Sequence, residues 1–441
     1  MSETLAALFP AHLATLCERA TAALAATGYR GLLLQAGSPL EIFLDDQHYP
    51  FRAHAPFKAW VPLLDAPQAL VWFEPGRRPC LVFPKVDDYW HKPARLPESW
   101  WTPHFEVREV RDAAGARAAL PASLARAAYI GTPFPELLGW GVAAINPQHL
   151  LLRLDYPRAA KTPYEIACLR EATRLGVHGH RCPGLRGRRQ RIRHPPGLSG
   201  RVRPARAGAA LQRHRGAQRG RRRAALPGAR APPSAERRSL LIDAGAEFAG
   251  YASDITRTLA GPAASGGFGE LVAGMDRLQQ GLCARVRAGV DWRDIHLASV
   301  EAVAGLLCES GILRCGPDEA VGRGLVTKFY PHGIGHLLGL QVHDVGGRQA
   351  GPEGGELPTP AGHPALRLTR RLEDGFVVTM EPGLYFIDAL LEPLRQGPDA
   401  AAVDWRRVEQ LRPCGGIRIE DDLVVRGSGC ENLTREAFSL S

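Results

Sequence analysis

This chain of 441 residues has no Cys-x-x-Cys pair, no basic leader and no long apolar run. Its nine cysteines are odd in number and widely scattered, which argues against a disulfide framework and against a thiolate zinc site. The first residues, Met-Ser-Glu-Thr, lack a secretory pattern, and no stretch approaches the roughly 18 apolar residues of a membrane span. We therefore expect a cytoplasmic protein with reduced thiols and no membrane partner.

Positive charge is concentrated in one segment. The net charge is +10, yet residues 181–238 contain 18 arginines, one acidic residue, no lysine and no aromatic residue. This segment carries about +17 and leaves the rest near −7. Three interpretations remain open: a disordered basic arm that binds nucleic-acid phosphates, a solvated linker, or a segment translated out of frame. We favour the last, because Arg, Ala, Gly and Pro are the residues that GC-only codons encode, and we expect no nucleic-acid partner.

The first part of the chain, residues 1–156, predicts an α/β domain. An Ala- and Leu-rich helix is expected at 13–26 and a short apolar strand at 31–35. Further strands are expected at 70–73, 80–83 and 105–110, the first two joined by the hairpin signal Pro75-Gly-Arg-Arg78. No residue in this part carries recognisable chemistry.

The second part, residues 157–441, predicts an α+β domain. It opens with a helix at Thr162, where Thr162 and Glu165 form a capping box and apolar residues follow at helical spacing. Beyond the arginine-rich segment, strands are expected within 239–259, at 376–381 and within 416–425, and helices at 279–286 and 294–308.

Two aspartates, Asp243 and Asp254, end or interrupt apolar strands. A hairpin that turns near Phe248 and Ala249 would place them opposite each other on one face. Two carboxylates so close together stay ionised only if a cation lies between them. An exposed hairpin with two solvated aspartates is the alternative, so the pair alone decides nothing.

Three histidines, His332, His336 and His343, follow within twelve residues and are separated by glycines that let the backbone approach a ligand. Glu381 ends an apolar strand, and Arg418 and Glu420 share one face of another. Four carboxylates and one imidazole form an oxygen-rich set suited to Mn²⁺ or Co²⁺. Two ions roughly 3.5–4 Å apart activate water and polarise a carbonyl, which is what peptide hydrolysis needs.

The order Asp, Asp, His, Glu, Glu resembles the metallopeptidases of the pita-bread fold, which include methionine aminopeptidase, aminopeptidase P and Xaa-Pro dipeptidase. The resemblance covers nearly the whole chain and is greatest to bacterial Xaa-Pro dipeptidases, through the stretches 41–52, 57–62 and 87–91. It implies an N-terminal α/β domain, a pita-bread catalytic domain and a homodimer. It also implies hydrolysis of dipeptides with a C-terminal proline by a metal-bridging hydroxide, with organophosphate hydrolysis as a side activity.

The resemblance also implies a role for each site residue. Two divalent ions per subunit are expected, Mn²⁺ first, with Co²⁺ or Zn²⁺ as alternatives, and the ligands would be Asp243, Asp254, His336, Glu381 and Glu420. Asp254 and Glu420 would bridge the ions, and Glu381 would also handle the proton of the hydroxide. His343 would steady the substrate oxygen, His332 and Arg418 would line the site, and Arg367 would hold the dipeptide carboxylate.

Residues 181–238 depart from the family pattern, since relatives place an aromatic residue and a histidine of the substrate pocket there. We therefore expect the chain to be less stable and less active than its relatives, or inactive. Two alternative functions remain: cleavage of longer Xaa-Pro peptides, as by aminopeptidase P, and an inactive pita-bread protein that binds RNA through the arginine-rich segment.

Overall fold

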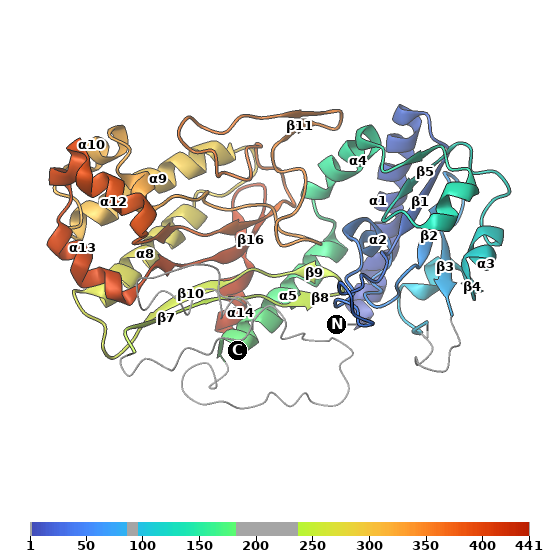
Figure 1. The fold of residues 1–441 in the computed structure, drawn as a ribbon, viewed down its shortest axis with the longest axis horizontal. Coiled ribbons are helices and arrows are strands. Elements are labelled where there is room, and N and C mark those ends of the chain that lie inside the picture. The colour runs from blue at the N-terminus through green and yellow to red at the C-terminus, as the bar shows by residue number, and fades with distance from the viewer. Residues whose placement is uncertain (1, 86–95, 182–236, 441) are drawn as a thin grey trace. The chain divides into compact units, whose positions relative to one another are not determined.

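A computed structural model describes residues 2–85, 96–181 and 237–440 (Figure 1). Most of the arginine-rich segment and the 87–91 stretch lie outside these residues. The described chain divides into two compact units: the first runs to Cys168 and includes Ala249–Tyr251 and Gln349–Gly355, and the second holds the remainder. The domain boundary after residue 156 stays a prediction.

The first unit contains a six-stranded mixed sheet in the order β4-β3-β2-β1-β5-β6. The central strand, β1, pairs antiparallel with β2 and parallel with β5, and the expected β2–β3 hairpin is present. Gly76 has φ +79° in that turn, a conformation that glycine adopts without strain. The strands are β1 (Gly31–Gln35), β2 (Leu70–Phe73), β3 (Cys80–Pro84), β4 (Glu106–Val110), β5 (Ala127–Ile130) and β6 (Ala144–Ile145).

In the described part of the first unit, four α-helices pack around this sheet. Helix α1 begins well before the predicted residue 13 and contains Pro10. The sheet core includes the buried side chains of Leu33, Val82 and Tyr129. The helices are α1 (Ser2–Thr27), α2 (Ala55–Trp60), α3 (Ala113–Ala118) and α4 (Gln148–Asp155).

Helix α5 (Pro163–Arg181) begins at the predicted capping box. The backbone N–H of Thr162 donates to Oε2 of Glu165 at 2.8 Å, and the N–H of Glu165 donates to Oγ1 of Thr162 at 3.4 Å. Ile166, Leu169 and Ala172 are buried on one face, as their helical spacing predicts.

The second unit is built on short antiparallel strands. β7 pairs with β10, β13 with β16, β16 with β17, and β14 with β15. The strands are β7 (Ser239–Asp243), β8 (Glu247–Phe248), β9 (Tyr251–Ala252), β10 (Thr256–Ala260), β13 (Val377–Met380), β14 (Gly383–Leu384), β15 (Ile417–Arg418), β16 (Asp421–Val425) and β17 (Cys430–Asn432). A separate ribbon pairs β11 (Gln349–Gly351) with β12 (Gly354–Glu356), and its residues through Gly355 belong to the first unit.

Helix α8 contacts β10, β13 and β15 and packs against α9 (Figure 1). It begins at Phe268 rather than at the predicted residue 279, because internal glycines weaken the sequence signal. One of them has a packing role, since a Cβ at Gly274 would lie 2.6 Å from Leu306 of α9. The helices are α8 (Phe268–Cys283), α9 (Trp292–Glu309), α10 (Pro317–Gly322), α11 (Val326–Phe329), α12 (Asp388–Gln396), α13 (Trp405–Leu411) and α14 (Leu433–Ser439).

The β7–β10 hairpin corrects the predicted register. Asp243 pairs with Thr256, not with Asp254. The turn lies at Ala249 and Gly250, both with positive φ, one residue later than predicted. A turn displaced by one residue moves each cross-strand partner by two, which preserves the face on which a side chain lies. Asp254 therefore stays on the expected face, two residues before Thr256.

Candidate metal centre

Four acidic or hydroxyl side chains occupy one row across the strands of the second unit. Asp243 pairs with Thr256, and Thr256 forms a bridge with Glu420. Glu381 comes one step beyond the last β13–β16 pair, Met380–Asp421, which places it opposite Glu420. Side chains in one such row lie on one face of the sheet. Segments far apart in the chain thus bring their polar side chains together.

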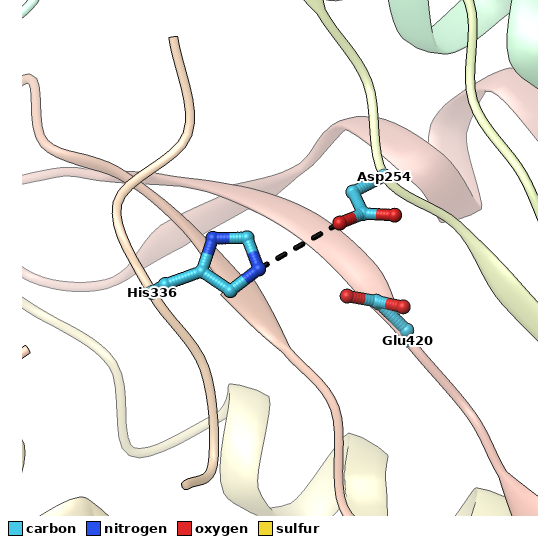
Figure 2. Close-up of side chains that lie close together, drawn as sticks. All are labelled: Asp254, His336 and Glu420. Carbon is cyan, nitrogen blue, oxygen red and sulfur yellow. Dashed lines mark ion pairs between the residues drawn. The ribbon is translucent and has the colours of Figure 1, made fainter. Parts of the chain in front are cut away.

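Asp254, His336 and Glu420 form the central cluster. Figure 2 shows their side chains directed toward one another from three separate segments. One ligand atom of each residue lies within 4.8 Å of those of the other two. Nε2 of His336 lies 3.6 Å from Oδ2 of Asp254 and 3.5 Å from Oε1 of Glu381. The cluster of three, with Glu381 beside it, thus contains four of the five predicted ligands.

A glycine lets the histidine segment lie against strand β13. The N–H of Thr379 donates to the carbonyl of His336 at 3.0 Å, and the N–H of His336 donates to Oγ1 of Thr379 at 3.1 Å. A Cβ at Gly335 would lie only 2.0 Å from the carbonyl oxygen of Thr379. Here glycine admits the neighbouring backbone rather than a ligand, and this contact fixes the position of His336.

Charge within the cluster favours a cation. Burial, together with the charges of Asp254 and Glu381, raises the pKa of Glu420 well above its ordinary value, although Arg418 opposes the shift. Burial acts to lower the pKa of His336, but its hydrogen bond with Asp254 and the charge of Glu381 raise it overall. A divalent ion would relieve the repulsion between these carboxylates, and oxygen donors with one imidazole suit such an ion. The donor set therefore fits the expected metal.

Asp243 is held differently from the other predicted ligands. Its carboxylate accepts a hydrogen bond from the guanidinium of Arg418. Nε of Arg418 lies 3.5 Å from Oε2 of Glu420 and donates to Oγ1 of Thr256 at 3.1 Å. The hydroxyl of Thr256 in turn donates to Glu420 at 2.6 Å. Arg418 thus neutralises part of the acidic row and pairs with Asp243, which is not part of the cluster of three.

His332 belongs to a hydrogen-bonded chain that ends at Arg418. Its Nδ1 lies 2.8 Å from the carbonyl of Gly333, so its Nε2 is the acceptor for the Tyr385 hydroxyl at 3.0 Å. Arg418 donates to the same hydroxyl at 3.3 Å. Burial lowers the pKa of His332, and burial also raises that of Tyr385 to about 12, so both are neutral near pH 7.

A cavity of about 450 Å³ opens beside the cluster and is lined by His336, His343 and Arg367. The rings of His336 and His343 are nearly perpendicular, with centroids 4.5 Å apart. Arg367 is exposed, as is His343. The volume lies in the range of small-ligand sites. The cavity thus joins a candidate metal ligand to a cationic side chain.

A buried carboxylate supports the segment that carries Asp254. The backbone N–H of Asp254 lies 3.2 Å from Oδ1 of Asp422, and the hydroxyl of Thr173 donates to Oδ2 of Asp422 at 2.9 Å. Burial raises the pKa of Asp422 well above its ordinary value. Helix α5 is thereby connected to the candidate ligand.

Sequence reasoning missed Thr256, Tyr385 and Asp422. Thr256 follows Asp254 by two residues, so strand alternation places both on one face and could have identified it. Tyr385 lies in the same segment as Glu381, but its two partners come from distant segments. No local pattern marks Asp422 as different from Asp421, which is buried among Arg257, Arg435 and Asn432.

Two family models match the chain: "Xaa-Pro dipeptidase, N-terminal domain" over residues 7–156 and "Metallopeptidase family M24" over residues 217–427. An Xaa-Pro dipeptidase from Stenotrophomonas maltophilia (strain K279a) is 41% identical over 447 residues, covering 99% of this chain and 98% of that protein. The chain belongs to the Xaa-Pro dipeptidase family of M24 metallopeptidases. A relative from Xanthomonas axonopodis pv. citri (strain 306), with the same name, is 42% identical and covers 99% of both.

Solved structures confirm the fold class. Pseudomonas aeruginosa aminopeptidase PepP matches with a TM-score of 0.67 and 22% identity, covering 96% of this chain and 95% of that one. Aminopeptidase P from E. coli with the inhibitor Pro-Leu matches with a TM-score of 0.61 and 21% identity, covering 98% and 95%. This family combines an N-terminal α/β domain with a C-terminal pita-bread domain. None of the described helices is long and apolar enough to cross a membrane.

Proposed function

We propose that this protein hydrolyses dipeptides whose second residue is proline, with divalent metal ions held at the Asp254, His336 and Glu420 cluster. The convergence of these three side chains is the observation that carries the proposal. Relatives that are 40–42% identical over nearly their whole length are named Xaa-Pro dipeptidases. Both lines of evidence point to the same chemistry, because a buried group of carboxylates and imidazole is suited to binding a hydrolytic metal.

Two ions per chain, Mn²⁺ in preference to Co²⁺ or Zn²⁺, are part of the proposal. Asp254 and Glu420 would lie between the ions, and His336 and Glu381 would hold one of them. Asp243 would hold the other once its hydrogen bond with Arg418 is released. Bound there, the ions would lower the pKa of water and polarise the peptide carbonyl.

The chain's own residues would then act on protons and on the substrate. Glu381 would accept the proton of the attacking water and pass it to the leaving proline nitrogen. His343 would donate to the carbonyl oxygen as it gains charge. Arg367, in the same cavity, would bind the proline carboxylate. His332 would have to change its ring orientation before it could exchange a hydrogen bond with the substrate, because Gly333 and Tyr385 already engage both its nitrogens.

A dipeptide is favoured over a longer peptide as substrate. The structures of aminopeptidase P are only 20–22% identical to this chain, so they support the fold alone. The curated dipeptidases are about twice as similar in sequence. Comparing the turnover of Leu-Pro with that of Leu-Pro-Gly separates the two activities: faster cleavage of the tripeptide would contradict the proposal.

Several features of the protein's biology follow as further proposals. We infer a cytoplasmic location, since every cysteine among the described residues is a free thiol. A homodimer and a slow organophosphate hydrolysis are expected from the family. RNA binding by the arginine-rich segment is the rival function, and a salt-sensitive RNA complex without metal-dependent hydrolysis would favour it.

The decisive assay is metal-reconstituted hydrolysis of a small Xaa-Pro panel. Asp254→Asn should abolish turnover, because an amide cannot supply the anionic ligand. Asp318→Asn, a change to an exposed side chain outside the site, should leave turnover intact. Equal activity of the native chain and Asp254→Asn would overturn the proposed metal site.

A further inference from the structure

A second cavity, of about 220 Å³, adjoins the candidate site but contains none of its metal ligands. Helix α9 contributes His296 to its wall, and α11 contributes Lys328. His332 and the segment Pro364–Leu366 also line the cavity. The same segment lines the cavity that holds Arg367, so the two cavities are neighbours.

His296 is the unusual residue of this cavity. Its side chain is 1% exposed, and neither ring nitrogen has a hydrogen-bond partner among the described residues. Its ring stands nearly perpendicular to that of His363, with centroids 4.6 Å apart. A buried polar group without a hydrogen bond destabilises the fold, so a bound ligand that forms this hydrogen bond would be stabilised. A buried imidazole without a partner in the wall of a cavity marks a candidate site for a polar ligand.

The charges of the residues that line the cavity favour an anionic ligand. Lys328 forms no ion pair with any described residue, and none of the lining residues is acidic. Burial, with smaller contributions from His363 and His332, lowers the pKa of His296 to about 3. His296 is therefore neutral near pH 7 and offers one N–H donor. An ammonium group with imidazole donors and no competing carboxylate is suited to binding a carboxylate.

The cavity's position relates it to the substrate. His332 lines the cavity, and its Nδ1 lies 3.9 Å from Oε2 of Glu381. A dipeptide whose scissile carbonyl lies at the metal cluster therefore has one end within reach of this cavity. If Arg367 holds the proline carboxylate in the neighbouring cavity, the side chain of the preceding residue is the remaining group to be placed.

We propose that the cavity formed by His296, Lys328 and His363 binds the carboxylate side chain of an aspartate or glutamate that precedes proline. The proposal rests on the proposed dipeptidase function and specifies its substrate class: acidic residue–proline dipeptides. Lys328 supplies the charge, and the two imidazoles supply N–H donors.

The test compares Glu-Pro with Gln-Pro, which have nearly the same shape and differ in side-chain charge. The full-length, Mn²⁺-loaded protein should show a higher kcat/KM for Glu-Pro, by about fivefold or more for a half-buried charge pair. Lys328→Met and His363→Ala should each bring the ratio of the two kcat/KM values toward one. Because the ratio is internal to each preparation, partial unfolding of a variant affects both rates and cancels.

Lys85→Met is the matched control, since Lys85 is an exposed lysine paired with Glu109 in the other unit, and it should leave the ratio unchanged. A native ratio at or below one would overturn the inference, as would a ratio unaffected by Lys328→Met. Cleavage of Leu-Pro distinguishes failure of this inference from failure of the proposed dipeptidase function. If Leu-Pro is cleaved but charge has no effect, only this inference fails, whereas no cleavage of Leu-Pro removes the dipeptidase function and the inference with it.

Discussion

Replacement of Glu420 by glutamine is expected to stabilise the metal-free protein near pH 7. The unfolded chain ionises this carboxyl near its ordinary pKa of 4.5, but burial and the charges of Asp254 and Glu381 raise the pKa in the folded protein. Asp254 and Glu420 have ligand atoms within 4.8 Å of each other. At an effective dielectric constant of about 20, that separation corresponds to a repulsion of about 3 kcal/mol.

The direction of the pH dependence follows from proton binding. Between the unfolded and the folded pKa, the folded protein holds the proton that the unfolded chain has lost. The free energy of unfolding therefore falls as pH rises above 4.5, by up to about 1.4 kcal/mol per pH unit. The loss reaches at most about 3 kcal/mol at pH 7, and Glu420→Gln removes it, because glutamine does not titrate.

Urea unfolding of the chelator-treated protein at pH 5 and pH 7 measures this effect. The stability gap between Glu420→Gln and the native chain should be below about 1 kcal/mol at pH 5 and should widen by pH 7, to no more than about 3 kcal/mol. Glu392→Gln, at an exposed position, is the control and should show no such widening. Excess Mn²⁺ should reverse the order at pH 7, because the ion binds only the native ligand set. A gap of constant size across this pH range would refute the reasoning.

Three further predictions concern single contacts and the reading frame. Thr256→Val should lower kcat/KM by about tenfold, because it removes the hydroxyl between Glu420 and Arg418; steady-state kinetics with Leu-Pro would show native turnover if that hydroxyl is dispensable. Thr162→Ala should lower the free energy of unfolding by about 1 kcal/mol, as measured by urea unfolding, because it removes the hydroxyl that accepts from the N–H of Glu165 and lies 2.9 Å from Nδ1 of the buried His12. Thr132→Ala, at an exposed position outside any cap, is its control. A frame-restored 181–238 segment should raise the melting temperature and the turnover of Leu-Pro, and equal values for both chains would contradict the frame interpretation.

The strands that carry the site were predictable because their patterns are local. Apolar runs interrupted by a single carboxylate identified β7, β13 and the strand pair that contains Arg418 and Glu420. The capping box of Thr162 and Glu165 located the start of α5 for the same reason: all its atoms come from four consecutive residues.

Features set by distant contacts were not predictable in this way. The hydrogen bond between Asp243 and Arg418 joins residues far apart in the chain, and no spacing indicates it. The turn at Ala249 and Gly250 was misplaced by one residue, because a positive φ at alanine has no sequence signal. Helix α8 was predicted to begin too late, because Gly274, which permits close packing against α9, has a low helix propensity.

The out-of-frame interpretation of the arginine-rich segment remains a prediction, since residues 182–236 lie outside the described part of the structure. The M24 match begins at residue 217, inside the arginine-rich segment, and curated relatives align with 99% of this chain and 98% of their own length. A chain with an inserted arm would be longer than its relatives. Near-equal lengths are instead what a replaced segment produces, which supports the out-of-frame interpretation; resequencing of the gene tests it.

The central claim, that separate segments of the chain bring acids and one imidazole around a pair of cations, is tested most directly by counting bound metal. Titration of the chelator-treated protein with Mn²⁺, followed by electron paramagnetic resonance, should show two ions per chain with the broadened signal of a spin-coupled pair. Asp254→Asn should lose that coupling. Absence of bound Mn²⁺, Co²⁺ and Zn²⁺ at saturating supply would contradict the claim.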